Sequence, residues 1–169
     1  INPAMLTFKP EARKTWETSK ESIINHIKGL VEEVIVDETV AIGIEDTTQC
    51  NSFIQAAIDH ETTYVALDSE TTGLYPRDGH ILGISLCFDG VQGAYINTEC
   101  FDETTEALLQ ELFTKKTVIF HNAKFDVAFF EYHFNFNFPS IEDTMLLHYL
   151  IDENPGGHGL KPLSIKYTV

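Results

Sequence analysis

The sequence predicts an α/β domain in which a mixed sheet is flanked by helices. Two observations lead to this prediction. Short β-branched and apolar runs alternate with longer amphipathic segments, and the predicted order is strands, helix, strand, helix and helix, which is typical of helices packed on a mixed sheet. With 169 residues, 43% of them hydrophobic, the chain is long enough to build one domain around a sizeable core.

The first part of the chain predicts a helical segment separate from this domain. After a polar lead over residues 1–10, apolar residues recur at helical spacing among charged ones over 11–33, which indicates an amphipathic helix. We therefore divide the chain into an amphipathic helical segment, 1–38, and a domain, 39–169. The apolar stripe is expected to pack within the protein, with a partner helix as the alternative. Since Ile1 is not an initiator methionine, we expect a piece of a longer protein.

The first half of the domain predicts several strands around one helix. Residues 34–36 and 39–44 are short β-rich runs, and Thr47 or Thr48 offers an N-cap for a helix to Asp59. Three more predicted strands follow, at 63–68, 81–88 and 93–96, the last two joined through the turn-forming pair Asp89-Gly90. We expect these three strands to be adjacent and antiparallel.

The second half alternates helices with one strand. Helices are predicted over 104–114, 123–134 and 143–151, a strand over 117–120, and a loop over 154–159 that opens a last short segment to Val169. Asp143 is the expected N-cap of the third helix. The alternation of Phe134, Phe136 and Phe138 predicts a short half-buried strand.

Charge and cysteine content restrict the class of function. A net charge of -15 with 11 scattered Lys and Arg residues argues against electrostatic binding to membranes or to long duplex DNA. An acidic protein still acts on nucleic acid when carboxylates recruit metal ions. Cys50, Cys87 and Cys100 form no Cys-x-x-Cys pair, so free thiols in a reducing cytoplasm are expected. No apolar run approaches the roughly 18 residues of a membrane span.

Two carboxylates end the predicted strand over 63–68 and mark a candidate site. Residues two apart share one face of a strand, so Asp68 and Glu70 can project together. Like charges at that spacing call for a metal ion or a shared proton. Asp126 lies in the helix entered directly after the strand 117–120, and functional groups of α/β sheets gather at the carboxyl ends of strands. Together the three carboxylates suit Mg²⁺ or Mn²⁺.

The motifs around these carboxylates resemble a known family. Asp68-Ser69-Glu70-Thr71-Thr72-Gly73-Leu74 and His121-Asn122-Ala123-Lys124-Phe125-Asp126 are similar to the first two motifs of the 3′–5′ proofreading exonuclease domain of family A DNA polymerases, of phage or bacterial type. Residues 142–146 and 159–163 also resemble that group. The resemblance covers about 39–169 and implies a ribonuclease H-like (DnaQ-like) fold, with a covalently linked polymerase domain in the full-length protein.

The resemblance also implies roles for single residues. Asp68 would bridge two metal ions, Glu70 would hold one and orient the attacking water, and Asp126 would hold the second. Around them, Leu74 would wedge against terminal bases and Phe125 would stack on the strand end. Two further residues, Thr71 and Asn122, would contact the substrate, which is the 3′ end of single-stranded DNA. Such a protein would work in the cytoplasm of a bacterial or phage-infected cell.

One departure from the family pattern concerns a fourth acidic residue. Family members carry it in a later Tyr-x-x-x-Asp or His-x-x-x-x-Asp motif. Tyr149 has Glu153 four places on, and His148 precedes Asp152 by four places rather than five, so neither pair matches. We therefore expect a domain incomplete at its C-terminus, truncated before the third exonuclease motif, with weak metal binding and low activity.

The candidate site residues also allow alternative interpretations. Asp68 and Glu70 also fit turn residues after a strand, and Asn122 and Asp126 fit an ordinary helix start. A phosphatase of the haloacid dehalogenase type would need a later Lys and a Gly-Asp-x-x-x-Asp pattern, which do not occur in order. A ribonuclease D-like exoribonuclease shares the same carboxylate cluster. An inactive exonuclease-like module that binds single strands or braces a polymerase is the remaining alternative.

Overall fold

The computed structural model describes residues 24, 40–154 and 157–167. By its internal contacts the chain divides into two units, Ile1–Glu38 and Thr39–Val169. In the first unit, Ile24 is helical and exposed. The rest of the amphipathic helix expected over 11–33, and the strand expected over 34–36, lie outside the described residues.

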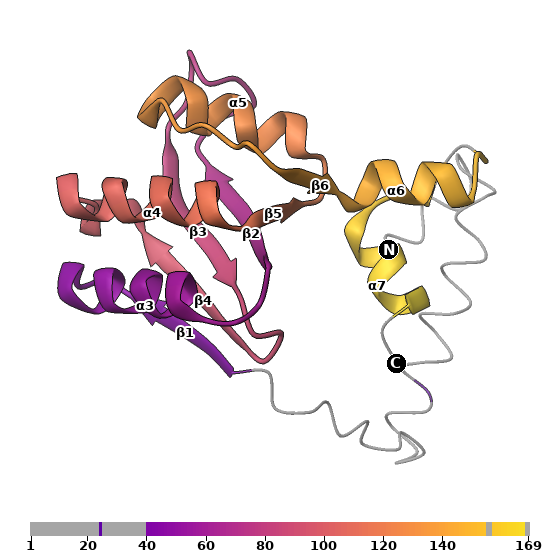
Figure 1. Ribbon diagram of the computed structural model, residues 1–169. Helices are drawn as coiled ribbons and strands as arrows, with labels where there is room; N and C mark the ends of the chain where they lie inside the picture. Colours follow the sequence, from indigo (N-terminus) through magenta and orange to yellow (C-terminus); the bar gives the residue numbers. More distant parts are fainter. Residues whose placement is uncertain (1–23, 25–39, 155–156, 168–169) are drawn as a thin grey trace. The chain divides into compact units, whose positions relative to one another are not determined.

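The second unit is built on one mixed sheet of six strands (Figure 1). Their order across the sheet is β1-β4-β3-β2-β5-β6. The strands β2, β3 and β4 are neighbours and antiparallel, as predicted, while the pairs β1–β4, β2–β5 and β5–β6 are parallel. The bounds are β1 Val40–Ile44, β2 Tyr64–Thr71, β3 Ile81–Cys87, β4 Gln92–Asn97, β5 Thr117–Phe120 and β6 Ile141–Asp143.

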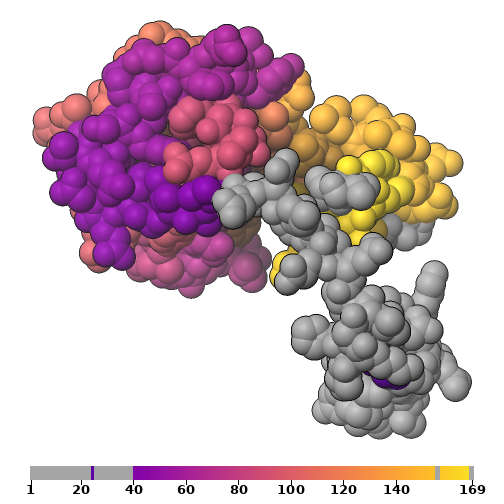
Figure 2. Space-filling model, turned by 90° about the horizontal axis from the view of Figure 1, so that it is seen from below, coloured from indigo at the N-terminus to yellow at the C-terminus, as the bar shows by residue number. Residues whose placement is uncertain are grey.

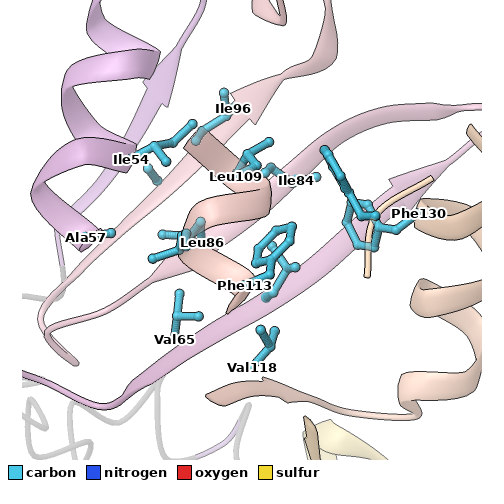
Figure 3. Packing of buried hydrophobic residues seen from close by; sticks show 14 of the residues in the cluster. Ile54, Ala57, Val65, Ile84, Leu86, Ile96, Leu109, Phe113, Val118 and Phe130 are labelled. Carbon is cyan, nitrogen blue, oxygen red and sulfur yellow. The ribbon is translucent and has the colours of Figure 1, made fainter. Parts of the chain in front are cut away.

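Three helices pack together on one face of this sheet. They are α3 Thr47–Asp59, α4 Glu103–Lys115 and α5 Ala123–Phe134, and their buried residues join those of the strands in a single core cluster. A short turn of 3₁₀ helix, Thr98–Cys100, precedes α4. Figure 3 shows Ile54 of α3, Leu109 and Phe113 of α4 and Phe130 of α5 directed at the strands. The predicted α/β architecture is confirmed.

Alternation along the strands explains why one sheet face is apolar. In β2, Val65 and Leu67 are buried, while Ala66 and Asp68 between and beyond them are exposed. The same pattern holds in β3 and β4, where Leu86 and Ile96 are buried. Because successive side chains of a strand point to opposite faces, the second face carries Asp68, and it is open in the part of the chain that the structure describes.

The last two helices, α6 Thr144–Ile151 and α7 Leu160–Tyr167, follow β6. Figure 2 shows them in gold and yellow at one end of the body formed by the sheet and its helices. Leu150 and Ile151 of α6 and Ile165 of α7 are each more than 70% exposed.

Among the described residues, no helix is long and apolar enough to cross a membrane. The three cysteines are free thiols, as expected.

The start of α3 differs from the sequence prediction. Asp46, rather than Thr47 or Thr48, is the N-cap, because its carboxylate accepts a hydrogen bond from the Gln49 N–H at 2.9 Å. The Thr47 hydroxyl instead donates to the Cys100 carbonyl at 2.9 Å. The prediction was wrong by one residue because a long-range partner engages the Thr47 hydroxyl.

The chain after α5 also differs from the prediction. Phe134 ends α5, and Asn135 then adopts a left-handed conformation with φ 55°. No strand therefore forms over 134–138, although Phe134, Phe136 and Phe138 pack against the core as the alternation suggested. The sequence did not predict β6, which pairs with β5, or α7. Asp143 is confirmed as the N-cap of α6, which begins at Thr144.

Candidate active site

The carboxylates of Asp68 and Glu70 lie on the open face of the sheet. The strand β2 runs to Thr71, beyond its predicted end, because β3 continues to pair with it. Asp68 is paired with Ser85 and Glu70 with Gly83, so both carboxylates have small neighbours on β3. The structure confirms that Asp68 and Glu70 share one strand face.

The electrostatic environment of Asp68 reflects this arrangement. Burial raises the pKa of Asp68, the neighbouring Glu70 carboxylate raises it further, and His121 lowers it. Besides the effect of burial, the two carboxylates repel each other because they carry like charges on one strand face. This pair of acidic groups is therefore suited to receive a cation.

Asp126 is attached to β2 at the residue between the two carboxylates. It is only 3% exposed, and its Oδ1 atom accepts hydrogen bonds from the Ser69 N–H at 2.9 Å and the Ser69 hydroxyl at 2.6 Å. The pairing of β2 with β5 ends at Ala66 and Ile119, and Asp126 takes up the Ser69 N–H beyond that point. Both bonds go to Oδ1, which leaves Oδ2 for another partner.

Burial and charge act together on Asp126. Burial raises its pKa, the two hydrogen bonds from Ser69 oppose that rise, and the Asp68 carboxylate adds to it. Asp68 thus interacts electrostatically with both Glu70 and Asp126. Within the described residues no three His, Cys, Asp or Glu side chains lie close enough together to form a metal-binding group.

The donor set nevertheless fits a hard divalent cation. Asp68, Glu70 and Asp126 offer only carboxylate oxygens, the ligands that Mg²⁺ and Mn²⁺ prefer. Burial is the main cause of the raised pKa values of Asp68 and Asp126, and repulsion from a neighbouring carboxylate adds to each of them. A bound cation would relieve this repulsion.

His121 was interpreted as structural, and its contacts place it beside the carboxylates. Its Nδ1 lies 2.9 Å from the Thr144 hydroxyl, which in turn donates to the Phe120 carbonyl at 3.1 Å. This arrangement places the proton on Nδ1 and leaves Nε2 buried without a hydrogen-bond partner. The sequence indicated the position of His121 after β5 but not its proximity to Asp68.

A cavity of about 420 Å³ extends from Asp68 across the open sheet face. Its lining includes Ser85, Tyr95, His121 and Thr144. The Tyr95 ring covers Gly83, where any added Cβ would meet the ring within 2.4 Å. Glycine is therefore required beside Glu70 so that the tyrosine can lie flat over β3.

Asp143 holds the turn that carries Asn122. Its carboxylate accepts from the N–H groups of Asn122 and Ala123 at 3.0 and 2.9 Å, and from those of Met145 and Leu146 at 2.9 and 3.4 Å. One side chain therefore caps the first turns of both α5 and α6. The sequence predicted only the second of these roles.

Asn122 adopts a left-handed conformation with φ 73° and makes no side-chain capping bond. Asparagine tolerates this conformation better than most residues. Since Asp143 performs the capping, the exposed Asn122 carboxamide is not occupied as a helix cap. The interpretation of Asn122 as an ordinary capping side chain is therefore wrong.

The other predicted substrate residues differ in their exposure. Leu74 is 77% exposed at the tip of the turn after β2. Phe125 is partly buried, with its ring centroid 5.1 Å from that of Phe129. The Thr71 hydroxyl donates to the Gly73 carbonyl at 2.8 Å and so stabilises the turn. Leu74 is thus the most accessible of the three.

Replacing Asp143 by alanine tests its double capping role. We expect Asp143→Ala to lower the free energy of unfolding at pH 7 by about 2 kcal/mol, since loss of one N-cap alone costs about 1 kcal/mol. Urea denaturation followed by circular dichroism measures this difference. Asp143→Asn, which keeps an acceptor oxygen, should lose less. An unchanged Asp143→Ala midpoint would contradict the capping role.

The lowered pKa of Asp143 predicts that the effect of Asp143→Ala on the free energy of unfolding depends on pH. Burial alone would raise the pKa of Asp143, but the four N–H groups prevail and hold it below its usual value. A carboxyl whose pKa is lowered on folding stabilises the protein above its unfolded pKa of about 3.9. That contribution is lost as the pH falls through the lower folded pKa. The difference between the unaltered chain and Asp143→Ala should therefore shrink only at acidic pH.

The chain is similar in sequence to known proteins. A family model described as 3′–5′ exonuclease matches residues 41–168. The DNA polymerase of Escherichia phage T5 is 38% identical over 176 residues, which cover 99% of this chain. The chain spans about a fifth of the length of that relative.

Solved structures share the fold. Escherichia coli RNase D aligns with a TM-score of 0.63 at 21% identity, covering 75% of this chain and 32% of its own. The catalytic core of RRP6 from Trypanosoma brucei aligns at 0.63 and 16%, covering 81% and 36%. NrnC of Brucella melitensis aligns at 0.58 and 19%, covering 76% and 60%. These likenesses confirm the ribonuclease H-like fold, and the family match over 41–168 shows that the chain belongs to the 3′–5′ exonuclease family.

Proposed function

We propose that this chain is the 3′–5′ exonuclease domain of a DNA polymerase and that it removes nucleotides from the 3′ end of single-stranded DNA. The single observation that carries the proposal is the carboxylate arrangement, in which Asp68 and Glu70 share one strand face and Asp126 is bound to Ser69 between them. The family match and the likeness to a phage DNA polymerase support the reaction and the polymerase context.

Asp68, Glu70 and Asp126 would hold Mg²⁺ or Mn²⁺ in this proposal. When two such ions are bound, they stabilise the attacking and leaving oxygens of a phosphodiester undergoing hydrolysis. The chain's own task is to hold the carboxylates in place. The rigid pairing of β2 with β3 performs that task for Asp68 and Glu70, and Ser69 performs it for Asp126.

Substrate contacts would come from the elements that surround the carboxylates. The exposed Leu74 would separate the terminal bases, Phe125 would stack on the strand end, and Asn122 would contact the sugar-phosphate backbone near the scissile bond. Thr71 would act through the turn that it stabilises. Stacking is tolerant of base sequence, as a proofreading function requires.

Residues 1–169 by themselves are expected to have low activity. Three carboxylates are a short ligand set for two ions, so residues 1–169 alone should hydrolyse slowly and bind metal weakly. The complete protein would combine this domain with a polymerase domain, and we place it in the cytoplasm of a bacterial or phage-infected cell. Its partner would be the 3′ end of a single strand.

Digestion of end-labelled strands tests the function. A 5′-labelled DNA strand should be shortened stepwise when Mg²⁺ is added, and EDTA should prevent it. The same assay with RNA distinguishes a deoxyribonuclease from an exoribonuclease of the RNase D kind, since the 2′-hydroxyl separates the two substrates. A chain that binds the strand but leaves it intact, in the complete protein as well, would instead be an inactive binding module.

A further inference from the structure

A groove lies between helix α5 and the turn that joins β2 to β3. It is lined by four residues of the turn between β2 and β3 and by two residues of α5, and encloses about 370 Å³. We call it the turn–α5 groove, and its lining residues are Tyr75, Pro76, Arg77, Asp78, Ala128 and Tyr132. Figure 1 shows this turn lying close to α5.

The groove presents two aromatic rings to solvent. Tyr75 is 67% exposed and Tyr132 is 59% exposed. Ala128, which has a small side chain, also lines the groove. Exposed tyrosines facing a common groove are typical of surfaces on which bases stack.

The two groove residues of α5 share a helical face with Phe125. Phe125, Ala128 and Tyr132 stand at positions i, i+3 and i+7 of the helix, and therefore share one helical face. Phe125 is the neighbour of Asp126 in the first turn. The seven residue steps from Phe125 to Tyr132 correspond to about 10 Å of helix, which is the length of about three stacked nucleotides at 3.4 Å each.

The turn that carries Tyr75 is held firmly at its base. The Thr72 N–H donates to the His80 carbonyl, and the His80 N–H donates to the Thr72 hydroxyl, both at 3.0 Å. A Cβ at Gly79 would lie 2.9 Å from the Gly73 nitrogen, so the two backbones touch. Such a turn presents Tyr75 with little ordering cost on binding.

Arg77 supplies the groove with positive charge. Among the described residues it makes no ion pair and no hydrogen bond, whereas Lys115 is paired with Glu111 at 2.6 Å. Lys116 is buried and donates to the His60 and Thr62 carbonyls. In a chain with a net charge of -15, an unengaged guanidinium beside two exposed rings is suited to bind a phosphate.

We propose that the turn–α5 groove binds the single strand on the 5′ side of the nucleotide to be removed, with Tyr75 and Tyr132 stacking on bases and Arg77 contacting a phosphate. The inference rests on the proposed function for its direction, because the 3′ end lies at Asp68. The groove thereby holds about three nucleotides beyond those at the carboxylates.

Binding without hydrolysis tests this inference. Fluorescence anisotropy of a 5′-labelled oligothymidylate of six nucleotides, measured in EDTA with the full chain, reports binding to the groove without hydrolysis. We expect Tyr75→Ala and Tyr132→Ala to weaken binding of six nucleotides at least about fivefold. Tyr75→Phe and Tyr132→Phe should keep the affinity, because they keep the ring.

Salt dependence tests the arginine separately. Arg77→Gln should reduce the slope of log affinity against log salt by about 0.7, the contribution of one phosphate contact on a single strand. The tyrosine variants should leave that slope unchanged. Matched controls are Lys115→Gln, which removes a positive charge outside the groove, and Tyr64→Ala, which removes a half-exposed ring at the opposite end of β2.

Two results would overturn the inference. One is the absence of six-nucleotide binding by the unaltered chain in EDTA, and the other is no loss of six-nucleotide binding in the correctly folded alanine variants. Failure of this inference and failure of the proposed function give different results. If only the proposed function fails, the strand binds through the groove in EDTA but remains intact when Mg²⁺ is added.

Discussion

Asp68→Asn is expected to reduce hydrolysis of a single strand by about a thousandfold or more. Asp68 interacts electrostatically with both Glu70 and Asp126, so it is the group whose loss affects the whole carboxylate arrangement. Stabilisation of a phosphodiester transition state by metal ions is worth several kcal/mol, and about 4 kcal/mol corresponds to a thousandfold. The rate of release of labelled nucleotide from a DNA strand, in the complete protein, measures the effect.

A stability measurement separates this effect from damage to the fold. Because the pKa of Asp68 is raised in the folded protein, its charge opposes folding at neutral pH. Without metal, Asp68→Asn should therefore melt at the same temperature as the unaltered chain or higher. Added Mg²⁺ should raise the melting temperature of the unaltered chain and not that of the variant.

Glu45→Gln provides the matched control for Asp68→Asn. Glu45 is an exposed acidic residue directly after β1, at the opposite edge of the sheet from β5 and β6. It should retain full activity and the full response to Mg²⁺. Activity of Asp68→Asn close to that of this control would refute the assignment of Asp68 as a metal ligand.

Phe113→Ala is expected to lower the free energy of unfolding by about 3–5 kcal/mol, the usual cost of removing a buried phenylalanine side chain. Phe113 is fully buried, and its ring centroid lies 4.8 Å from that of Phe138, 5.5 Å from Phe136 and 6.3 Å from Phe130. It joins α4 to α5 and to the segment that leads into β6. A loss of this size is a large fraction of the stability of an ordinary domain.

Urea denaturation followed by circular dichroism measures the change, with Leu150→Ala as the control. Leu150 is 85% exposed on α6, so its truncation should change the free energy of unfolding by less than about 0.5 kcal/mol. If Phe113→Ala cost no more than Leu150→Ala, the assignment of Phe113 to the centre of the core would be wrong.

Local chemistry made several features predictable from the sequence. The alternation of side chains in a strand is enough to place Asp68 and Glu70 on one face, and the structure confirms it. The Asp89-Gly90 turn was also predictable from the local sequence, because glycine favours the φ of 76° that Gly90 takes and Asp89 accepts hydrogen bonds from the nearby Val91 and Gln92 N–H groups. The antiparallel group β2, β3 and β4 follows from such short connections.

Features that depend on distant partners were not predictable. The alternation of Phe134, Phe136 and Phe138 suggested a strand, but the rings pack on α4 and α5 without a neighbouring strand to pair with. The N-cap of α3 moved to Asp46 because the Thr47 hydroxyl bonds to Cys100, 53 residues away. Neither partner can be identified from the neighbouring sequence.

By itself, the sequence determined the fold class, the two exonuclease-like motifs and the face shared by Asp68 and Glu70, because these depend on periodicity and on residues close in the chain. Only the tertiary structure showed that Asp126 is bound to Ser69, that Asp143 caps α5 as well as α6, and that Tyr75 and Tyr132 face one groove. Each of these contacts joins residues brought together by strand pairing and core packing, whose outcome depends on the whole chain.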